Sequence, residues 1–195
     1  MSAVPSLRIA AVAVLVGLSQ ATTVMAADPL DPVKIIMSIA GWKDSQAPKV
    51  EAQGYFDENL LTSIYSASFT DVYHLAQKTD ELQDGAGYML GYDVVIGGQD
   101  SCDLKQVRIE PRSLDDGTTA VDVYFDAMSC FGNQPDLTQP QTVFHVIKED
   151  GRYVVDNLWN DDYREGALES SIKAQFAALT EAYLQFRLTG SWPKE

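Results

Sequence analysis

The chain has 195 residues, with 14 basic and 28 acidic side chains, so its formal net charge is −14. A protein this acidic is repelled by phosphate backbones and by anionic lipid, so we expect it to bind neither nucleic acid nor a membrane surface. Acidity of this kind supports solubility. It also suits a basic partner protein, and both interpretations stay open.

Residues 1–26 are predicted to be a signal peptide. Arg8 precedes the apolar run Ile9 to Leu18, and Val24-Met25-Ala26 has the small-x-small pattern of a signal-peptidase site. The run is too short to span a bilayer, and no cysteine follows it for lipid attachment. We therefore expect cleavage near Ala26 and a periplasmic or secreted protein with no membrane anchor, whose residues 27–195 form a single domain of net charge 13 − 28 = −15.

Two helices are predicted in the first half of this domain. The first begins at Asp31-Pro32, with Asp as the cap and Pro in the first turn, and Gly41 ends it. Apolar residues then recur in steps of three and four from Leu61 to Ala76, which predicts a second helix over about 58–81. The spacing of a capping box at Ser68 leaves a break near that residue open.

Cys102 and Cys130 are predicted to form a disulfide, as two cysteines in an exported chain most simply do. Strand-like segments 104–109 and 120–125 flank a turn centred on Asp116. A hairpin with that centre pairs residues whose numbers sum to 232, and 102 and 130 have this sum. The disulfide would remove both sulfurs from nucleophilic or metal chemistry.

The same register has one unfavourable consequence, because it places Glu110 opposite Asp122. Either Pro111 ends regular pairing there, or the register lies two residues away.

Segments 142–148 and 153–159 predict a second hairpin around the turn Asp150-Gly151. Pairing across this turn places His145 opposite Asp156. Three roles stay open for the pair: a structural tie between two polar groups in an apolar sheet face, a non-catalytic lining of a pocket, or a general base oriented by the carboxylate. Tyr124 or Tyr88 would be the third catalytic member.

The glycine-rich segment 84–100 is predicted to be a loop with a short strand at most. Its aromatic residues Tyr88 and Tyr92, together with Phe131 of a later loop, are candidates for a recognition surface because pockets open where loops meet the end of a sheet.

Three acidic residues bracket the same loop. Asp93, Asp100 and Asp103 could hold calcium through oxygen ligands, but their spacing favours turn formation and strand capping. His74, alone on the second helix, is expected at the surface. We expect no metal and no cofactor.

A last amphipathic helix is predicted over 164–187, with Gly190 and Pro193 beyond its end. Asn160, Asp161 and Asp162 are expected to cap its start. Helices, then consecutive antiparallel strands, then a helix give an α+β fold with a curved sheet of about four strands. Such a sheet can curl around the helices and leave a cone-shaped cavity.

The order of elements resembles the nuclear-transport-factor-2-like superfamily, which includes ketosteroid-isomerase-like enzymes and many non-catalytic binding modules. Tyr92-Asp93, Gly98-Gln99-Asp100 and the stretch 149–157 (EDGRYVVDN) are similar to a family of secreted bacterial domains of unknown function with this cystatin-like cone fold. That family usually has Trp after the last turn and Asp-Asp at the strand end, where this chain has Tyr153 and Asp156-Asn157. The resemblance implies the cone fold and no established activity.

We therefore expect a non-catalytic exported protein that binds a small apolar ligand, or a basic envelope protein such as a toxin or hydrolase that it would neutralise. The binding residues we predict are Tyr88, Tyr92, Asp93, Asp100 and Phe131. The alternative is a small-pocket enzyme of isomerase or dehydratase type that uses His145 and Asp156.

Overall fold

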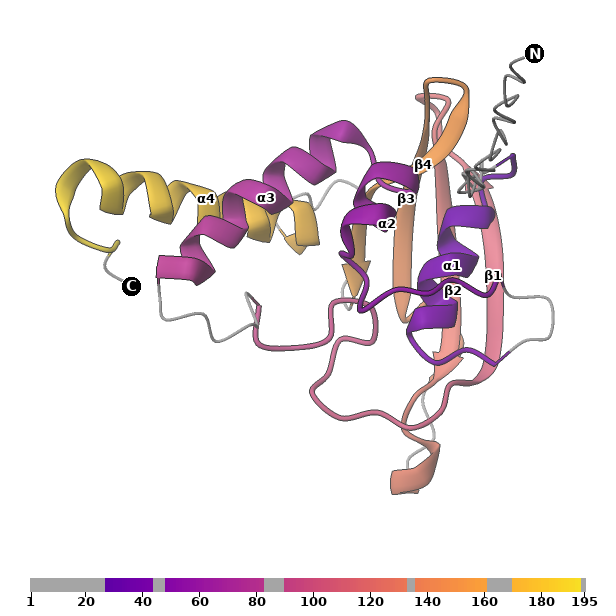
Figure 1. Ribbon diagram of the computed structural model, residues 1–195. Helices are drawn as coiled ribbons and strands as arrows, with labels where there is room; N and C mark the ends of the chain where they lie inside the picture. Colours follow the sequence, from indigo (N-terminus) through magenta and orange to yellow (C-terminus); the bar gives the residue numbers. More distant parts are fainter. Residues whose placement is uncertain (1–26, 44–47, 83–89, 133–135, 161–169, 194–195) are drawn as a thin grey trace, which may run out of the picture.

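The structure, a computed structural model, describes residues 27–43, 48–82, 90–132, 136–160 and 170–193. This part of the chain contains four α-helices and one antiparallel sheet of four strands in the order β1-β2-β3-β4 (Figure 1), which confirms the predicted α+β class. The elements are α1 (Asp31–Ile39), α2 (Glu58–Ser63), α3 (Ala67–Leu82), β1 (Lys105–Ser113), β2 (Thr119–Asp126), the 3-10 turn η1 (Ser129–Phe131), β3 (Thr142–Glu149), β4 (Arg152–Asn160) and α4 (Ile172–Thr189).

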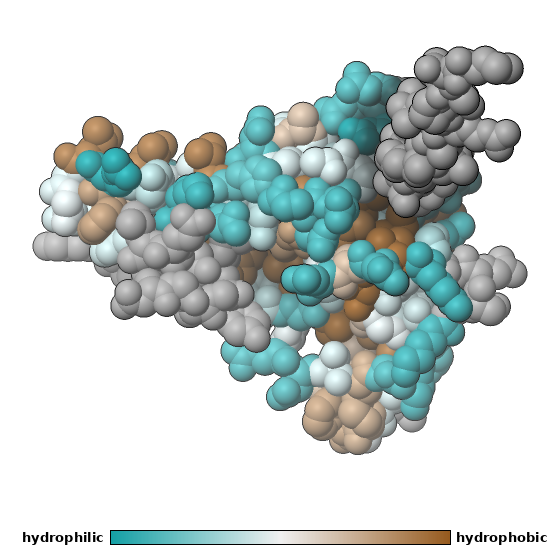
Figure 2. Space-filling model, in the orientation of Figure 1, coloured by the Kyte–Doolittle hydropathy of each residue, from teal (hydrophilic) through white to brown (hydrophobic). Residues whose placement is uncertain are grey.

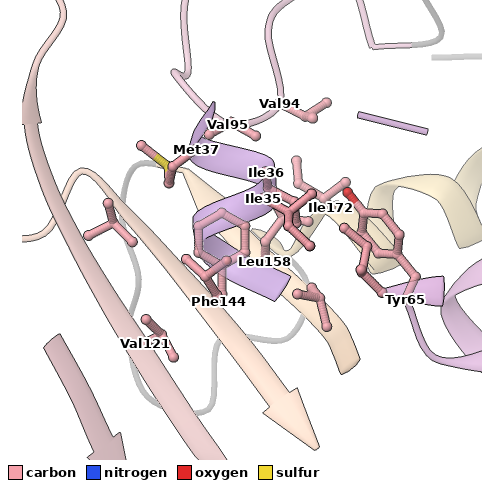
Figure 3. Close-up of a cluster of buried hydrophobic side chains, with 14 of the residues drawn as sticks. Ile35, Ile36, Met37, Tyr65, Val94, Val95, Val121, Phe144, Leu158 and Ile172 are labelled. Carbon is pink, nitrogen blue, oxygen red and sulfur yellow. The ribbon is translucent and has the colours of Figure 1, made fainter. Parts of the chain in front are cut away.

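Helix α1 covers one face of the sheet. Its buried side chains Ile35, Ile36 and Met37 lie over Phe144 and Leu158 of the central and edge strands (Figure 3), and all five are at most 1% exposed. The space between α1 and the sheet is therefore filled by side chains.

The predicted cap of α1 is wrong by one residue. Leu30 occupies the N-cap position without a side-chain hydrogen bond, and Asp31 is the first helical residue. The Asp31 carboxylate instead accepts hydrogen bonds from the backbone N–H groups of Ala27 (3.0 Å) and Asp28 (2.9 Å). It thus sits in the first turn, where negative charge is favoured by the helix dipole.

The predicted long helix is divided into α2 and α3. Between them Tyr65 forms a parallel bridge with Val155 of β4. Val155 N–H donates to the Ile64 carbonyl (2.8 Å), and Ser66 N–H donates to the Val155 carbonyl (2.9 Å). The break therefore lies just before Ser68, and pairing with the open edge of β4 satisfies the backbone groups that the helix loses there.

The first hairpin has the predicted register. Residues from Arg108 to Ser113 pair with partners whose numbers complete the sum of 232, and the Cys102–Cys130 disulfide closes the open end with Cα atoms 5.9 Å apart. Gln106, with φ +53°, marks an irregularity that shifts the pairing by one residue near the disulfide.

Pairing continues through Pro111, which lies opposite Val121, so Pro111 does not end the ladder. Glu110 and Asp122 do face each other across the strands. Arg108 Nε lies 2.7 Å from the Glu110 carboxylate and Arg112 Nε lies 3.4 Å from that of Asp122, so each acid has a cation that offsets the repulsion.

The second hairpin is confirmed, but its predicted register holds only near the turn. Asp150 and Gly151 have φ of +50° and +82°, as a two-residue hairpin turn of this kind requires. The pairing is as predicted from Glu149 to Val146 and then shifts by one residue, so His145 pairs with Asn157. The prediction that His145 faces Asp156 is therefore wrong, because a β-bulge leaves Asp156 without a cross-strand partner.

Helix α4 begins at Ile172, where Ser171 is the N-cap and its Oγ accepts a hydrogen bond from Ala174 N–H (3.1 Å). Ser170 and Ser171 lie outside this helix, so the predicted start at 164 is wrong at least there, and residues 161–169 lie outside the described part. Gly190, with φ +70°, ends the helix as predicted. Helices α3 and α4 lie side by side and extend beyond the β4 edge of the sheet (Figure 1).

Among the described residues, no helix is long and apolar enough to cross a membrane. The disulfide is compatible with an extracellular location.

Candidate functional site

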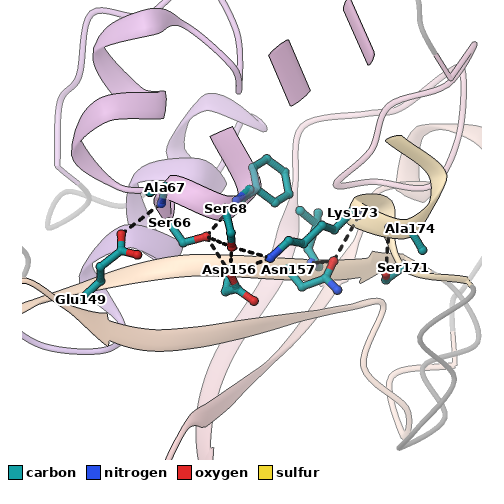
Figure 4. A network of polar contacts seen from close by, with 11 residues as sticks. Ser66, Ala67, Ser68, Glu149, Asp156, Asn157, Ser171, Lys173 and Ala174 are labelled. Atoms are coloured by element: carbon teal, nitrogen blue, oxygen red, sulfur yellow. Dashed lines mark hydrogen bonds and ion pairs between the residues drawn. The ribbon is translucent and has the colours of Figure 1, made fainter. Parts of the chain in front are cut away.

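Asp156 is the centre of a polar network between β4 and the starts of two helices (Figure 4). Its Oδ1 accepts hydrogen bonds from Ser66 Oγ (2.6 Å) and Ser68 Oγ (2.9 Å), and it lies 2.8 Å from the ammonium of Lys173. The Lys173 ammonium also donates to Ser68 Oγ (2.7 Å). Three donor side chains from two segments therefore share one carboxylate oxygen.

Both helices that meet here present their N-termini to β4. The Glu149 carboxylate accepts from Ala67 N–H (3.0 Å) at the start of α3, and Asn157 Oδ1 accepts from Lys173 N–H (3.2 Å) at the start of α4. Negative charge and oxygen acceptors are favoured at helix N-termini, where backbone N–H groups lack partners. The β3–β4 hairpin thus places acceptors at the starts of both helices.

The pKa of the Asp156 carboxyl is lowered. Burial by itself would raise this pKa, but hydrogen bonds from Lys173 and Ser66 and the positive charge of Lys173 outweigh it. The Lys173 ammonium is thus engaged by both Asp156 and Ser68. The network acts as a structural tie.

His145, in β3, belongs to a separate group that it forms with residues of the β1–β2 turn. Its Nε2 lies 2.6 Å from Thr118 Oγ1, which also donates to the Asp116 carboxylate at 2.5 Å. Because the single hydroxyl hydrogen goes to Asp116, Nε2 must carry the proton that fills the Thr118 contact. The His145 ring also lies edge-on to Trp159, with centroids 6.5 Å apart. His145 and Asp156 therefore have different hydrogen-bond partners.

A cleft of about 850 Å³ opens between α3, α4 and two loops. In Figure 2, apolar side chains are recessed behind hydrophilic ones on the face that this view shows. None of the described residues that line the cleft belongs to a strand or to α1, so the cleft lies beside the packed core and not between α1 and the sheet. Its lining residues are Gln53, Gly54, Tyr55, Phe56, Tyr73, Gln77, Leu90, Gly91, Tyr92, Asp93, Val94, Gln99 and Phe176.

Asp93 builds one wall of this cleft. Its Oδ1 accepts from the N–H groups of Val95 and Ile96 (both 2.9 Å), and its Oδ2 accepts from the Tyr55 hydroxyl (2.8 Å). This confirms the turn-forming role predicted for Asp93. Burial, followed by the charge and hydrogen bond of Asp93, raises the pKa of Tyr55, so the phenol stays neutral.

The loop that carries Asp93 is fixed to the end of the sheet. Thr142 Oγ1 donates to the Val95 carbonyl at 2.5 Å, and Asn160 Nδ2 donates to the Val94 carbonyl at 2.9 Å. Asn160 is therefore a strand residue that anchors the cleft loop, and it does not cap α4 as predicted. Asp161 and Asp162 lie outside the described residues.

Aromatic rings form the apolar part of the lining. Phe56 packs against Tyr73 and Phe176, with ring centroids 4.7 and 5.5 Å apart, and Tyr92 donates from its hydroxyl to Gln175 Oε1 (2.8 Å). These contacts connect the first loop, α3, α4 and the glycine-rich loop. The rings are thus held in place before any ligand arrives.

Two polar side chains of the lining have hydrogen-bonding groups that are not used within the described part of the chain. Within the described part of the chain, no hydrogen bond reaches the side-chain amides of Gln53 or Gln77. The lining residues that the structure describes include no Lys or Arg. The cleft thus combines apolar rings, free amides and one already hydrogen-bonded carboxylate.

The remaining predicted binding residues are dispersed. Asp100 lines a smaller cleft of about 520 Å³ on the other side of the glycine-rich loop. Phe131 is 55% exposed beside the disulfide and lines neither cleft, and Tyr88 lies outside the described residues. Tyr92 and Asp93 are the two that the structure brings together.

The acidic residues and the helical histidine do not converge on a metal. Asp103 pairs with Lys43 (2.6 Å), and His74 contacts Glu58 (3.0 Å) at the surface. Among the described residues, no group of three or more potential ligands could hold a metal ion.

Four aromatic residues of the cleft were missed in the sequence. The predicted apolar stripe of the second helix includes Tyr65, Phe69 and Val72. Tyr73 directly follows Val72 and therefore lies one position off the stripe. This offset is the signal that could have placed the Tyr73 ring outside the core. Nothing local identifies Tyr55, Phe56 and Phe176, which come together only in the fold.

Comparison of the chain with known proteins gives no match, whether to a family model, to a curated protein or to a solved structure.

Proposed function

We propose that this protein is an exported, non-catalytic binding protein whose ligand occupies the cleft between α3, α4 and the two loops. The observation that carries the proposal is the lining itself: pre-packed rings beside free amides in a volume typical of ligand sites, which run from about 300 to 1,000 Å³. A ligand that fits must be partly polar, and so differs from the purely apolar one expected from the sequence.

The absence of a catalytic arrangement at the predicted pair supports binding over turnover. His145 is engaged by Thr118, and Asp156 is engaged by Ser66, Ser68 and Lys173. The isomerase- or dehydratase-type alternative depended on these two residues facing each other. The enzyme alternative therefore loses His145 as its base and Asp156 as the carboxylate that would orient it.

Export and a cone-type fold are part of the same proposal. The N-terminal pattern with cleavage near Ala26 and the Cys102–Cys130 disulfide support a periplasmic or secreted location. The element order supports a nuclear-transport-factor-2-like cone of the kind found in secreted domains of unknown function. In this chain the ligand site would lie beside the sheet, because the side chains of α1 fill the space over the sheet face that the helix covers.

Gly54 offers a sharp test of the cleft. A Cβ added at Gly54 would meet nothing within 4 Å, and its φ is not in the left-handed region. Gly54→Trp should therefore fill the cleft without straining the fold, whereas Gly54→Ala should leave it open.

The three forms would be incubated with small molecules from a cell-envelope extract, and bound species would be identified by native mass spectrometry. We expect the wild type and Gly54→Ala to retain a small molecule that Gly54→Trp does not. Retention by none of them, or equally by all three, would contradict the proposal.

A basic envelope protein, such as a toxin or hydrolase, is the second candidate ligand, because the net charge of residues 27–195 is −15. Pull-down from the same extract should then recover a basic protein at about 50 mM salt and lose it at about 300 mM, since screening weakens attraction between exposed charges. Recovery of no partner at either salt concentration would remove this candidate.

A further inference from the structure

We propose that the cleft binds a neutral saccharide, with its rings stacked against sugar C–H groups and its free amides hydrogen-bonded to sugar hydroxyls. This inference rests on the proposed function and names the class of ligand. It follows from three properties of the lining: its charge, its rings and its unused polar groups.

Charge excludes the anionic class of ligand. None of the described residues that line the cleft is Lys or Arg, so a carboxylate or phosphate would lose its hydration without gaining a cationic partner among them. The net charge of −15 on residues 27–195 adds long-range repulsion.

A cation gains little from the cleft either. Asp93 is the one acidic residue among the described residues of the lining, and its two oxygens already accept three hydrogen bonds, two from backbone N–H groups and one from Tyr55. The phenols of Tyr55 and Tyr65 stay neutral because burial, above all, raises the pKa of each. A neutral ligand avoids both the uncompensated loss of hydration of an anion and the weak pairing of a cation.

The rings match the apolar side of a sugar. Aromatic faces carry partial negative charge, which attracts the polarised C–H groups on one face of a pyranose. Tyr55, Phe56, Tyr73, Tyr92 and Phe176 all contribute to the lining, and contacts among Phe56, Tyr73 and Phe176 fix three of these rings.

The unused polar groups match the hydroxyl edge of a sugar. The amides of Gln53 and Gln77 each offer a donor and an acceptor, which is what a hydroxyl needs.

Three tetrasaccharides with the same β-1,4 backbone test the inference. Cellotetraose is neutral, tetraglucosamine is cationic and tetraglucuronate is anionic. Titration calorimetry at pH 7 and at two salt concentrations would give their affinities for the full exported chain. We expect cellotetraose to bind at least about tenfold more tightly than either charged tetramer, with no dependence on salt, because its contacts are not ionic.

Gln77→Leu should weaken cellotetraose binding by about five- to tenfold, the loss expected for one hydrogen bond. Gln185→Leu is the matched control, since Gln185 is exposed on the distal half of α4 and does not line the cleft. This variant should bind as the wild type does. Circular dichroism would show that both variants are folded.

The saccharide inference is overturned if cellotetraose does not bind, if tetraglucosamine or tetraglucuronate binds more tightly, or if Gln77→Leu has no effect. The proposed function fails by a different result, namely the absence of any extract ligand that Gly54→Trp displaces. A displaced ligand without cellotetraose binding would thus leave a binding protein that selects another class of molecule.

Discussion

At the scale of single residues, Asp156 shows how one carboxylate can organise a junction. It lies in a β-bulge, is contacted by serines at the start of α3 and by the ammonium of Lys173 at the start of α4, and is only 20% exposed. Deleting it would leave a half-buried cation and several hydroxyls without their acceptor, and such losses cost more than an exposed ion pair is worth.

Asp156→Ala should therefore lower the free energy of unfolding by about 2–3 kcal/mol, or the melting temperature by about 5–10 °C for a domain of this size. Asp103→Ala is the control, because Asp103 also pairs with a lysine but both side chains are about 70% exposed. Asp103→Ala should lower the free energy of unfolding by less than about 1 kcal/mol. Equal effects in urea denaturation would show that the bulge network contributes nothing special.

The lowered pKa of Asp156 also gives a pH dependence. Its folded pKa lies below the unfolded value of about 3.9, so its ionised form favours folding. This stabilisation is complete above about pH 5 and is lost as pH falls through the folded pKa. The stability difference between the wild type and Asp156→Asn should thus shrink between pH 6 and pH 2.5 in urea titrations. A constant difference would contradict the assigned ion pair.

Residue-level prediction from the sequence succeeded where the signal was local. Asp150-Gly151 identified the turn, and the register follows from it as far as Val146 and Val155. The shift at Asp156 could not be predicted, because the groups that stabilise the bulge, Ser66 and Lys173, are distant in the sequence. A one-residue shift then changes every pairing beyond it, including that of His145.

At the scale of elements, the β1–β2 hairpin is determined by local signals that the sequence shows, whereas the division of α2 from α3 depends on a contact that is distant in the sequence. Two cysteines and an Asp-Gly turn, all within one segment, determine the hairpin register. The end of α2 is set by Tyr65 pairing with Val155, a contact that helical periodicity cannot reveal. The apolar stripe continues through the break, so the sequence predicts one helix where the fold has two.

Replacing Cys102 and Cys130 together by serine should lower the free energy of unfolding by about 3–4 kcal/mol, because the disulfide closes a loop with a sequence separation of 28 and restricts the unfolded chain. Urea denaturation of the oxidised wild type, the reduced wild type and the double variant would measure this. The reduced wild type and the variant should agree, and the folded hairpin should keep its register in both. A loss below about 1 kcal/mol would contradict this role.

At the scale of the whole molecule, a packed unit of α1 and the sheet carries a pair of helices that extends past its edge (Figure 1). Five of the nine residues of α1 and four of the eight residues of β3 are buried, whereas Leu184 and Leu188 of the distal α4 are 51% and 86% exposed. The cleft lies where these two parts meet. Four separate segments build it, so the sequence could indicate Tyr92 and Asp93 through their loop but not their neighbours.

Hydrogen exchange should follow this division. Backbone amides of β3 should exchange only by global unfolding, whereas those of residues 182–189 should exchange faster, by local fraying, because few buried contacts hold them. Exchange monitored by NMR at neutral pH would measure both rates. Equal protection of the two segments would show that the distal α4 is covered in solution.

The short pairing of Ile64–Ser66 with Val155 also protects the protein against self-association. A bare edge strand is a template for adding strands from other molecules, and this segment occupies part of the outer side of β4. The opposite edge strand, β1, has no such covering segment among the described residues. It carries Lys105, Arg108 and Pro111, which disfavour strand addition. Any substitution that detaches the α2–α3 junction would uncover β4 and turn a loss of local structure into a route to aggregation.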